Sequence, residues 1–196
     1  MLPEVRVSCS STRHADDADL THYISRHRVM APAHHFTISL NWTGNRGSGT
    51  SGYRDYDRCH ELSRPGKQVI AGSSDPVFHG DGTRYNPEEL FVGALSSCHM
   101  LWYLHLCAVA GVVVESYCDD AEGTMQIEAN GGGRFTEVIL RPRCRYKDPV
   151  DPSVVRRLHH ESHALCFVAN SVNCPVRVEP ADDDALSAAA PSIPAA

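Results

Sequence analysis

The chain has 196 residues, which suits one domain with a sizeable core and loose ends. Its 42% hydrophobic and 21% charged residues exclude a disordered or fibrous chain. The formal net charge of −6 leaves no basic excess for binding nucleic acid or an anionic membrane. Eight cysteines are too sparse at this length for a disulfide-stapled scaffold, so most are expected to be free thiols.

The two ends of the chain lack the patterns of a folded core. Residues 1–34 show no hydrophobic periodicity and begin without the apolar run of a secretory signal. Residues 181–196 are rich in Ala, Pro and Asp, with few large apolar groups. We therefore expect disordered ends around one domain at 35–180, in a protein of the reducing cytoplasm.

Short alternating segments open the domain. Residues 36–42 alternate with period two and predict a strand, and residues 44–49 form a glycine-rich turn. Residues 50–62 and 67–71 predict a second and a third strand. Residues 72–86 are rich in Gly, Ser, Asp and Pro, which is typical of a loop.

A long helix is predicted next. Asn86 suits the N-cap, Pro87 suits the first helical position, and the two glutamates that follow complement the helix dipole. The helix is expected to run to about Ala110 and to stop at Gly111.

The 25 residues from Leu90 to Val114 contain no Asp, Glu, Lys or Arg, and by length they could cross a bilayer. Serine and histidine side chains interrupt this run, and no Lys or Arg cluster flanks it. We therefore expect a helix buried on nearly all sides, followed by the start of a strand, and no membrane span.

The second half of the domain returns to strands. The predicted elements are strands at 112–117, 123–129, 135–146 and 174–179, a hairpin turn at 130–133 and a helix at 151–169. Because strands and helices do not alternate, the predicted fold class is α+β rather than a doubly wound parallel sheet.

Cys98 lies in the middle of the long helix. Taken alone, this position favours a structural cysteine, because free cysteines are among the most buried residues. A reactive thiolate needs nearby positive charge or hydrogen-bond donors. The helix offers no cation, so an arginine would have to come from another part of the fold.

A second cluster carries metal-ligand side chains. Spacings of four and three place His159, His163 and Cys166 on one face of the second predicted helix. Three such ligands could bind zinc, which makes a non-catalytic metal- or small-molecule-binding protein the alternative function. The simpler interpretation is a water-facing, histidine-rich surface with an inward cysteine, so no metal is expected.

The arginines near the first strands give no motif by themselves. Arg46 lies in a glycine-rich turn, but no Gly-Lys-Ser/Thr helix start follows it, so the turn is not a phosphate loop. Arg54 and Arg58 alternate with tyrosines and resemble the polar face of a strand. No Gly-x-Ser-x-Gly element supports a serine hydrolase.

Several segments together resemble the OsmC/Ohr family of thiol-dependent peroxidases. The segment YNPEELFVGALSSC, which ends at Cys98, is similar to the family's Asn-Pro-Glu helix start and reactive cysteine. The segment ALCFVANS around Cys166 resembles the helix of the family's second cysteine. The segment WTGNRGSG around Arg46 resembles an N-terminal turn that carries an arginine. The resemblance covers the whole predicted domain.

The resemblance implies an OsmC-like fold, with antiparallel sheets wrapped around long central helices in an intertwined homodimer. A helix at the centre of such a dimer would need no charged face. The implied activity is the reduction of organic hydroperoxides, such as fatty-acid peroxides, in defence against oxidative or osmotic stress. The resemblance implies no bound cofactor, and its usual reductant is a dihydrolipoyl group on a partner protein.

The resemblance also implies a role for each site residue. Cys98 is the peroxidatic thiol, which becomes a sulfenic acid, and Cys166 is the resolving thiol, which forms a disulfide with it. Arg46 stabilises the thiolate and Glu88 orients Arg46 by a bidentate pair.

Two of these assignments have alternatives. Arg54 or Arg58 could take the place of Arg46, because the match around that arginine is short. Cys174 is the reserve for Cys166, because the second cysteine of the Ohr branch is followed by proline and here only Cys174 is.

Overall fold

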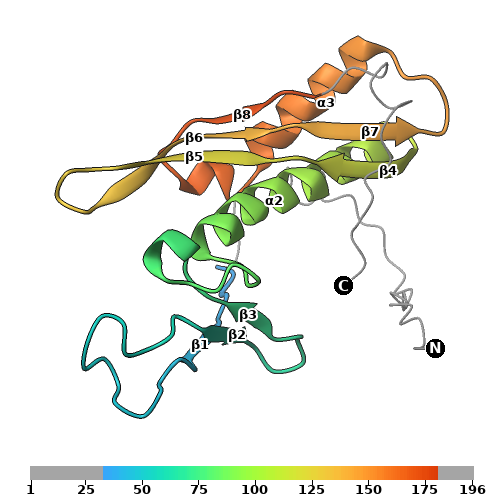
Figure 1. The fold of residues 1–196 in the computed structure, drawn as a ribbon. Helices are drawn as coiled ribbons and strands as arrows, with labels where there is room; N and C mark the ends of the chain where they lie inside the picture. Colours follow the sequence, from blue (N-terminus) through green and yellow to red (C-terminus); the bar gives the residue numbers. More distant parts are fainter. Residues whose placement is uncertain (1–32, 181–196) are drawn as a thin grey trace, which may run out of the picture. The chain divides into compact units, whose positions relative to one another are not determined.

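The computed structural model describes residues 33–180. The expectations of disorder at the two ends therefore lie outside the described residues, apart from residues 33 and 34, which have no regular structure. Residues 38–180 belong to one compact unit of mixed helix and sheet, which confirms the α+β class (Figure 1).

A small antiparallel sheet opens this unit, in the order β1-β2-β3. Its strands are β1 (Ser39–Trp42), β2 (His60–Ser63) and β3 (Ile70–Gly72). The predicted second strand at 50–62 is therefore wrong over most of its length. The segment before β2 is an irregular loop instead, tied to β1 by the Trp42 indole N–H, which donates to the Asp57 carbonyl at 2.8 Å.

Helix α2 (Pro87–Val109) confirms the local signals for a helix. The Asn86 side chain accepts from the Glu89 N–H at 2.8 Å, and the Glu89 carboxylate accepts from the Asn86 N–H at 3.0 Å. This capping box satisfies two backbone donors that the first helical turn leaves free. Gly111, with φ of +73°, ends the helix region in a conformation that favours glycine.

Burial of α2 differs from the expectation. Its fully buried side chains are spaced four residues apart, so they form one face: Leu95, His99, Tyr103 and Cys107. Leu101 and Val109 are 63% and 62% exposed on other faces. The prediction of burial on nearly all sides is wrong for the single chain, since the rest of the chain covers one face only. By length and composition α2 could also cross a membrane, a test that core helices pass as well.

Two further sheets follow α2. Strands β4 (Val114–Asp119) and β7 (Pro142–Tyr146) form an antiparallel pair. Strands β5 (Glu122–Ile127) and β6 (Gly133–Leu140) form a hairpin, and β8 (Val176–Val178) adds to β6 in parallel.

The predicted strand at 135–146 is thus two strands that belong to different sheets. The break falls at Arg141, whose N–H donates at 2.6 Å to the side-chain carboxylate of Asp119, the last residue of β4, instead of to a backbone carbonyl.

The last helix, α3 (Pro152–Leu165), is shorter than expected. The backbone at Cys166 is extended, with φ of −67° and ψ of 107°, so the helix ends before the predicted boundary at 169. Single turns of 3-10 helix, η1 (Pro76–Phe78) and η2 (Ala169–Ser171), complete the elements of the described residues.

Helices α2 and α3 pack against each other and alongside strands β4 to β8 (Figure 1). Two buried clusters form this core. One cluster joins α2, β7 and α3 and consists of Tyr103, Cys107, Cys144 and Leu158. The other joins α2 to β6 and consists of Leu95, Val138 and Leu140.

Candidate active site

The structure brings two distant cysteines together. Cys98 lies on α2, and Cys166 is the first residue after α3, where the chain leaves the helix. The Cys98 side chain is a near neighbour of the Cys166 thiol and affects its pKa. Two neighbouring thiols can form a disulfide where the backbone lets their sulfurs meet.

The two thiols differ in their access to solvent. Cys98 is half-buried, whereas Cys166 is 0% exposed. Burial raises the pKa of Cys166 to about 11, and the neighbouring Cys98 adds to this effect. The Ala169 N–H donates to the Cys166 sulfur at 3.4 Å and holds it in place. A solvent-borne substrate can therefore reach Cys98 first, with Cys166 protonated behind it.

Two aromatic side chains lie near this thiol pair. Trp102 is one helical turn after Cys98, and Phe167 directly follows Cys166. Their rings meet edge to face, with centroids 5.5 Å apart. Phe167 is 71% exposed, so it adds an apolar surface at the mouth of the site. The sequence analysis passed over Phe167, although its position beside a candidate cysteine was a usable signal.

Glu88 lies in the first turn of α2, away from any described arginine partner. It lines a surface hollow of about 570 Å³. The charged side chains around this hollow are all acidic: Asp75, Glu88, Glu89, Asp119 and Glu122. Such a lining favours a cationic group over an anionic one.

Arg46 lies on the loop between β1 and β2, and the structure does not bring it together with Glu88. Its guanidinium donates to the Arg54 carbonyl and pairs with the Asp57 carboxylate at 3.7 Å. Both members of this ion pair are about half exposed. Within the described residues of a single chain, the expected Arg46–Glu88 pair is therefore replaced by a pair inside the loop.

The two alternative arginines lie in the same loop. Arg54 contributes the carbonyl that accepts from Arg46. The Arg58 guanidinium lies over the rings of Tyr53 and Tyr56, at 4.6 Å and 4.2 Å from their centroids, and donates to both tyrosine carbonyls. Arg58 thus stabilises the loop through two rings and two carbonyls, whereas Arg46 is held by one carbonyl and one exposed ion pair.

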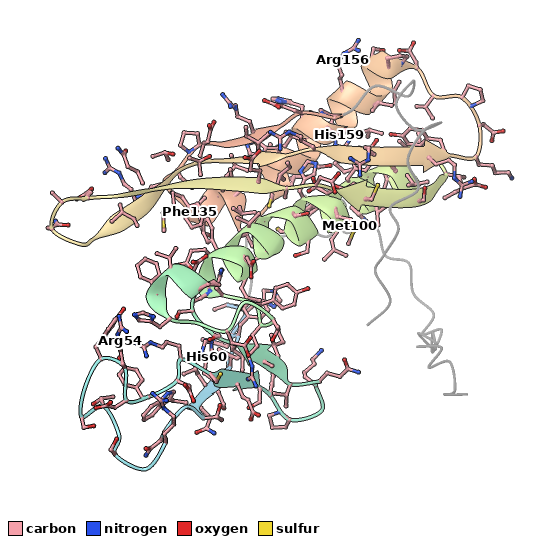
Figure 2. The ribbon with its side chains drawn as sticks, in the orientation of Figure 1. Arg54, His60, Met100, Phe135, Arg156 and His159 are labelled. Atoms are coloured by element: carbon pink, nitrogen blue, oxygen red, sulfur yellow. The ribbon has the colours of Figure 1, made fainter. Side chains whose placement is uncertain are left out.

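Cys174 is not part of the pair formed by Cys98 and Cys166. It precedes β8, packs against the cluster around Leu95, and lines a hollow of about 560 Å³ beside the stacked rings of Phe91 and Phe135. Figure 2 shows Phe135 on the side of β6 that faces the first half of α2. The contact with Cys98 is made by Cys166, which favours Cys166 as the resolving thiol.

The trio considered as an alternative metal site does not form among residues 33–180. No group of three His, Cys, Asp or Glu side chains among residues 33–180 is placed to hold a metal ion. Cys166 lies against Cys98, and the His159 Nδ1 atom lies 3.0 Å from the Nε2 atom of His99. The helix ends before Cys166, so the spacing that placed the three residues on one helical face no longer applies.

Two other cysteines are shielded in the core. Cys107 and Cys144 are 1% and 6% exposed. Burial raises the pKa of both thiols, that of Cys144 to about 12. They therefore remain protonated near neutral pH, which makes them poor nucleophiles.

Comparisons with known proteins show the family and the fold. A sequence model described as OsmC-like protein matches residues 80–181. The structure of an OsmC-like protein of unknown function from Vibrio cholerae is 32% identical, with 76% of this chain and 100% of that chain covered and a TM-score of 0.69.

Two more distant relatives come from Bacillus subtilis. The uncharacterized protein YmaD is 22% identical over 150 residues, which cover 74% of this chain and 91% of YmaD. The organic hydroperoxide resistance protein OhrB is 18% identical, with 74% of this chain and 98% of that chain covered and a TM-score of 0.52. At this identity, the likeness to OhrB is one of fold.

Proposed function

Since the chain belongs to the OsmC-like protein family, we propose that it is a thiol-dependent peroxidase that reduces organic hydroperoxides. The observation that carries this proposal is the placement of a half-buried cysteine on α2 beside a buried cysteine after α3. Relatives named as organic hydroperoxide resistance proteins share the fold and lend it support. We assign the protein to peroxide stress defence in the cytoplasm.

The first step oxidises Cys98. Its thiolate attacks the outer oxygen of the hydroperoxide R–O–O–H, and a sulfur–oxygen bond forms as the oxygen–oxygen bond breaks. The leaving alkoxide takes up the proton that the thiol lost and departs as the alcohol R–OH. Sulfur loses two electrons in this step and the peroxide gains them.

The second step joins the two cysteines. The Cys166 sulfur attacks the sulfenic acid of Cys98, the sulfur–sulfur bond forms, and hydroxide leaves with the Cys166 proton as water. An external dithiol of the lipoyl type then supplies two electrons and two protons and restores both thiols. No bound cofactor takes part in this cycle.

A cation beside Cys98 would complete the site, because positive charge favours a thiolate and a developing alkoxide. We assign this role to Arg46, with Glu88 as the carboxylate that orients it. Arg46 pairs with Asp57 on its own loop, so the proposed role requires that exposed pair to exchange. Surface ion pairs of this kind contribute only about 0–1 kcal/mol, so the exchange costs little.

Apolar surfaces left open by the single chain support a homodimer. The alternate residues of β1 and its approach, Ile38, Leu40 and Trp42, are 63%, 65% and 38% exposed. Among the strands of residues 33–180, β1 is also an edge strand, and its outer side pairs with no other described strand. A second copy of the chain would cover this edge and the open side of α2.

We expect the protein to have twice the mass of the 21.5 kDa chain in solution. Light scattering coupled to size-exclusion chromatography measures this mass directly. Replacing Leu40, at the middle of the open strand face, by lysine is expected to shift the mass toward that of one chain. Glu61→Lys, on the neighbouring strand β2 and opposite Asn41, is the control that places a lysine on the other face of the sheet. A wild-type protein of single-chain mass at micromolar concentration would contradict the dimer.

The substrate preference tests the proposed function itself. Trp102 and Phe167 give the thiol pair an apolar border, so an alkyl or aryl hydroperoxide should bind better than hydrogen peroxide. With dihydrolipoamide as reductant, we expect kcat/KM for cumene hydroperoxide to exceed that for hydrogen peroxide by at least about tenfold. Absence of turnover with both peroxides would overturn the proposal.

A further inference from the structure

Two histidines and a tyrosine form a stacked group in the core between α2 and α3. His99 is 0% and His159 3% exposed, and their rings are nearly parallel, with centroids 5.3 Å apart. The His159 ring also stacks on Tyr103 at a centroid distance of 3.8 Å. Figure 2 places His159 on α3, and Arg156 nearer to the N-terminal end of the same helix.

The two rings share one hydrogen bond, between His99 Nε2 and His159 Nδ1 at 3.0 Å. The bond needs one donor and one acceptor, so at least one of the two rings must be neutral, because a protonated imidazole only donates. The Nδ1 atom of His99 is buried and has no partner among the described residues. An unpaired acceptor costs less than an unpaired donor, which favours His99 Nε2–H as the donor to His159.

The hydrogen bond and the thiol pair join the same two segments of the chain, α2 and α3 with the residue after it. His99 follows Cys98 directly on α2, and Cys166 lies seven residues, about two helical turns, after His159. The hydrogen bond joins residues 60 apart in the sequence and is buried. It therefore resists a slide of α3 along α2, and such a slide would separate the two sulfurs.

We propose that the His99–His159 hydrogen bond is a positioning device that holds Cys166 against Cys98 and so raises the effective concentration of one thiol at the other. This inference rests on the proposed function, because it assigns the hydrogen bond to the resolving step. This role would account for the burial of two polar side chains, His99 and His159, in a core that apolar side chains alone could fill. The oxidation of Cys98 itself does not depend on it.

The test separates positioning from peroxidase chemistry. The equilibrium between the Cys98–Cys166 disulfide and dithiothreitol measures the effective concentration of the two thiols without any peroxide. His159→Phe keeps the ring stack and removes the hydrogen bond, and it is expected to lower this equilibrium constant by about tenfold. Dimedone labelling of Cys98 after one equivalent of cumene hydroperoxide is expected to be unchanged in a Cys166→Ser background.

Conservative and control variants make the result specific. An Asn amide sits at the position of a histidine Nδ1 atom, so His159→Asn is expected to restore most of the equilibrium constant. His160→Phe, on the exposed side of the same helix, is the matched control and should match the wild type. Should His159→Phe fail to fold, His99→Phe removes the same hydrogen bond from the other helix.

The outcomes are distinct. A lower stability of His159→Phe with an unchanged disulfide equilibrium would assign the histidines a structural role only and overturn the inference. Failure of the proposed function would show as absent peroxide turnover in the wild type. The dithiothreitol equilibrium would still report on positioning in that case.

Discussion

Replacing Cys98 by serine is expected to abolish the reduction of organic hydroperoxides, with kcat/KM falling by at least about a thousandfold. A serine hydroxyl keeps the shape of the site but cannot supply the thiolate that attacks the oxygen–oxygen bond. Cys98 is also the partly exposed member of the thiol pair, so no other thiol in contact with the site can replace it at the surface. Peroxide consumption coupled to dihydrolipoamide oxidation measures the loss.

The Cys166→Ser variant should behave differently. It is expected to release one equivalent of alcohol per chain at the wild-type rate and then to stop, with a sulfenic acid trapped at Cys98 by dimedone. Cys59→Ser, which removes another partly exposed thiol before β2, is the control and should retain full turnover. Normal turnover by Cys98→Ser would contradict the proposed mechanism, and turnover by Cys166→Ser at the wild-type rate would remove Cys166 from it.

The elements that could be predicted are those with local signals. The start of α2 depends on Asn86, Pro87 and Glu89, which are neighbours in the sequence, and its end depends on Gly111. The hairpin between β5 and β6 likewise follows from the glycines between two alternating segments. Each of these signals involves only residues that are close in the sequence, so it can be recognised from the sequence alone.

The predictions that were wrong concern element boundaries that depend on residues far away in the sequence. The break between β6 and β7 needs the carboxylate of Asp119, 22 residues before Arg141. The end of α3 coincides with the placement of Cys166 against Cys98. Secondary-structure propensities do not predict such contacts, because the contacts form only once the helices and sheets have packed.

The candidate site shows the same division. The contact between Cys98 and Cys166 was expected from the family resemblance, and no spacing along the chain could have given it. Arg46 was expected to pair with Glu88. It pairs instead with Asp57, which is close in sequence because it lies on the same loop. The hydrogen bond between His99 and His159 had no sequence signal, because two buried histidines on separate helices follow no period.

Acidification is expected to destabilise the protein through these two histidines. Burial lowers the pKa of His99 to about 4, aided by the nearby His163, and lowers that of His159 to about 3, aided by His99. Other groups facing this region are Tyr103 at the stack and Arg156 and His160 at the hollow beside His159. A histidine in the unfolded chain has a pKa of about 6.5. Below that pH, these two histidines are therefore protonated in the unfolded chain but stay neutral in the folded chain.

Because the unfolded chain binds more protons than the folded chain at low pH, the free energy of unfolding decreases as the pH falls. Stability is full above about pH 6.5 and falls as the pH drops toward 4, by up to about 1.4 kcal/mol per pH unit for each histidine. Urea unfolding at pH 7.5 and at pH 5 should therefore differ by on the order of 2–4 kcal/mol. The double variant His99→Phe/His159→Phe cannot titrate and keeps the stack, so its unfolding free energy should change much less over this range. Its difference from the wild type cancels the contribution of the carboxylates, and an equal loss in both proteins would mean that the buried rings take up their protons without unfolding.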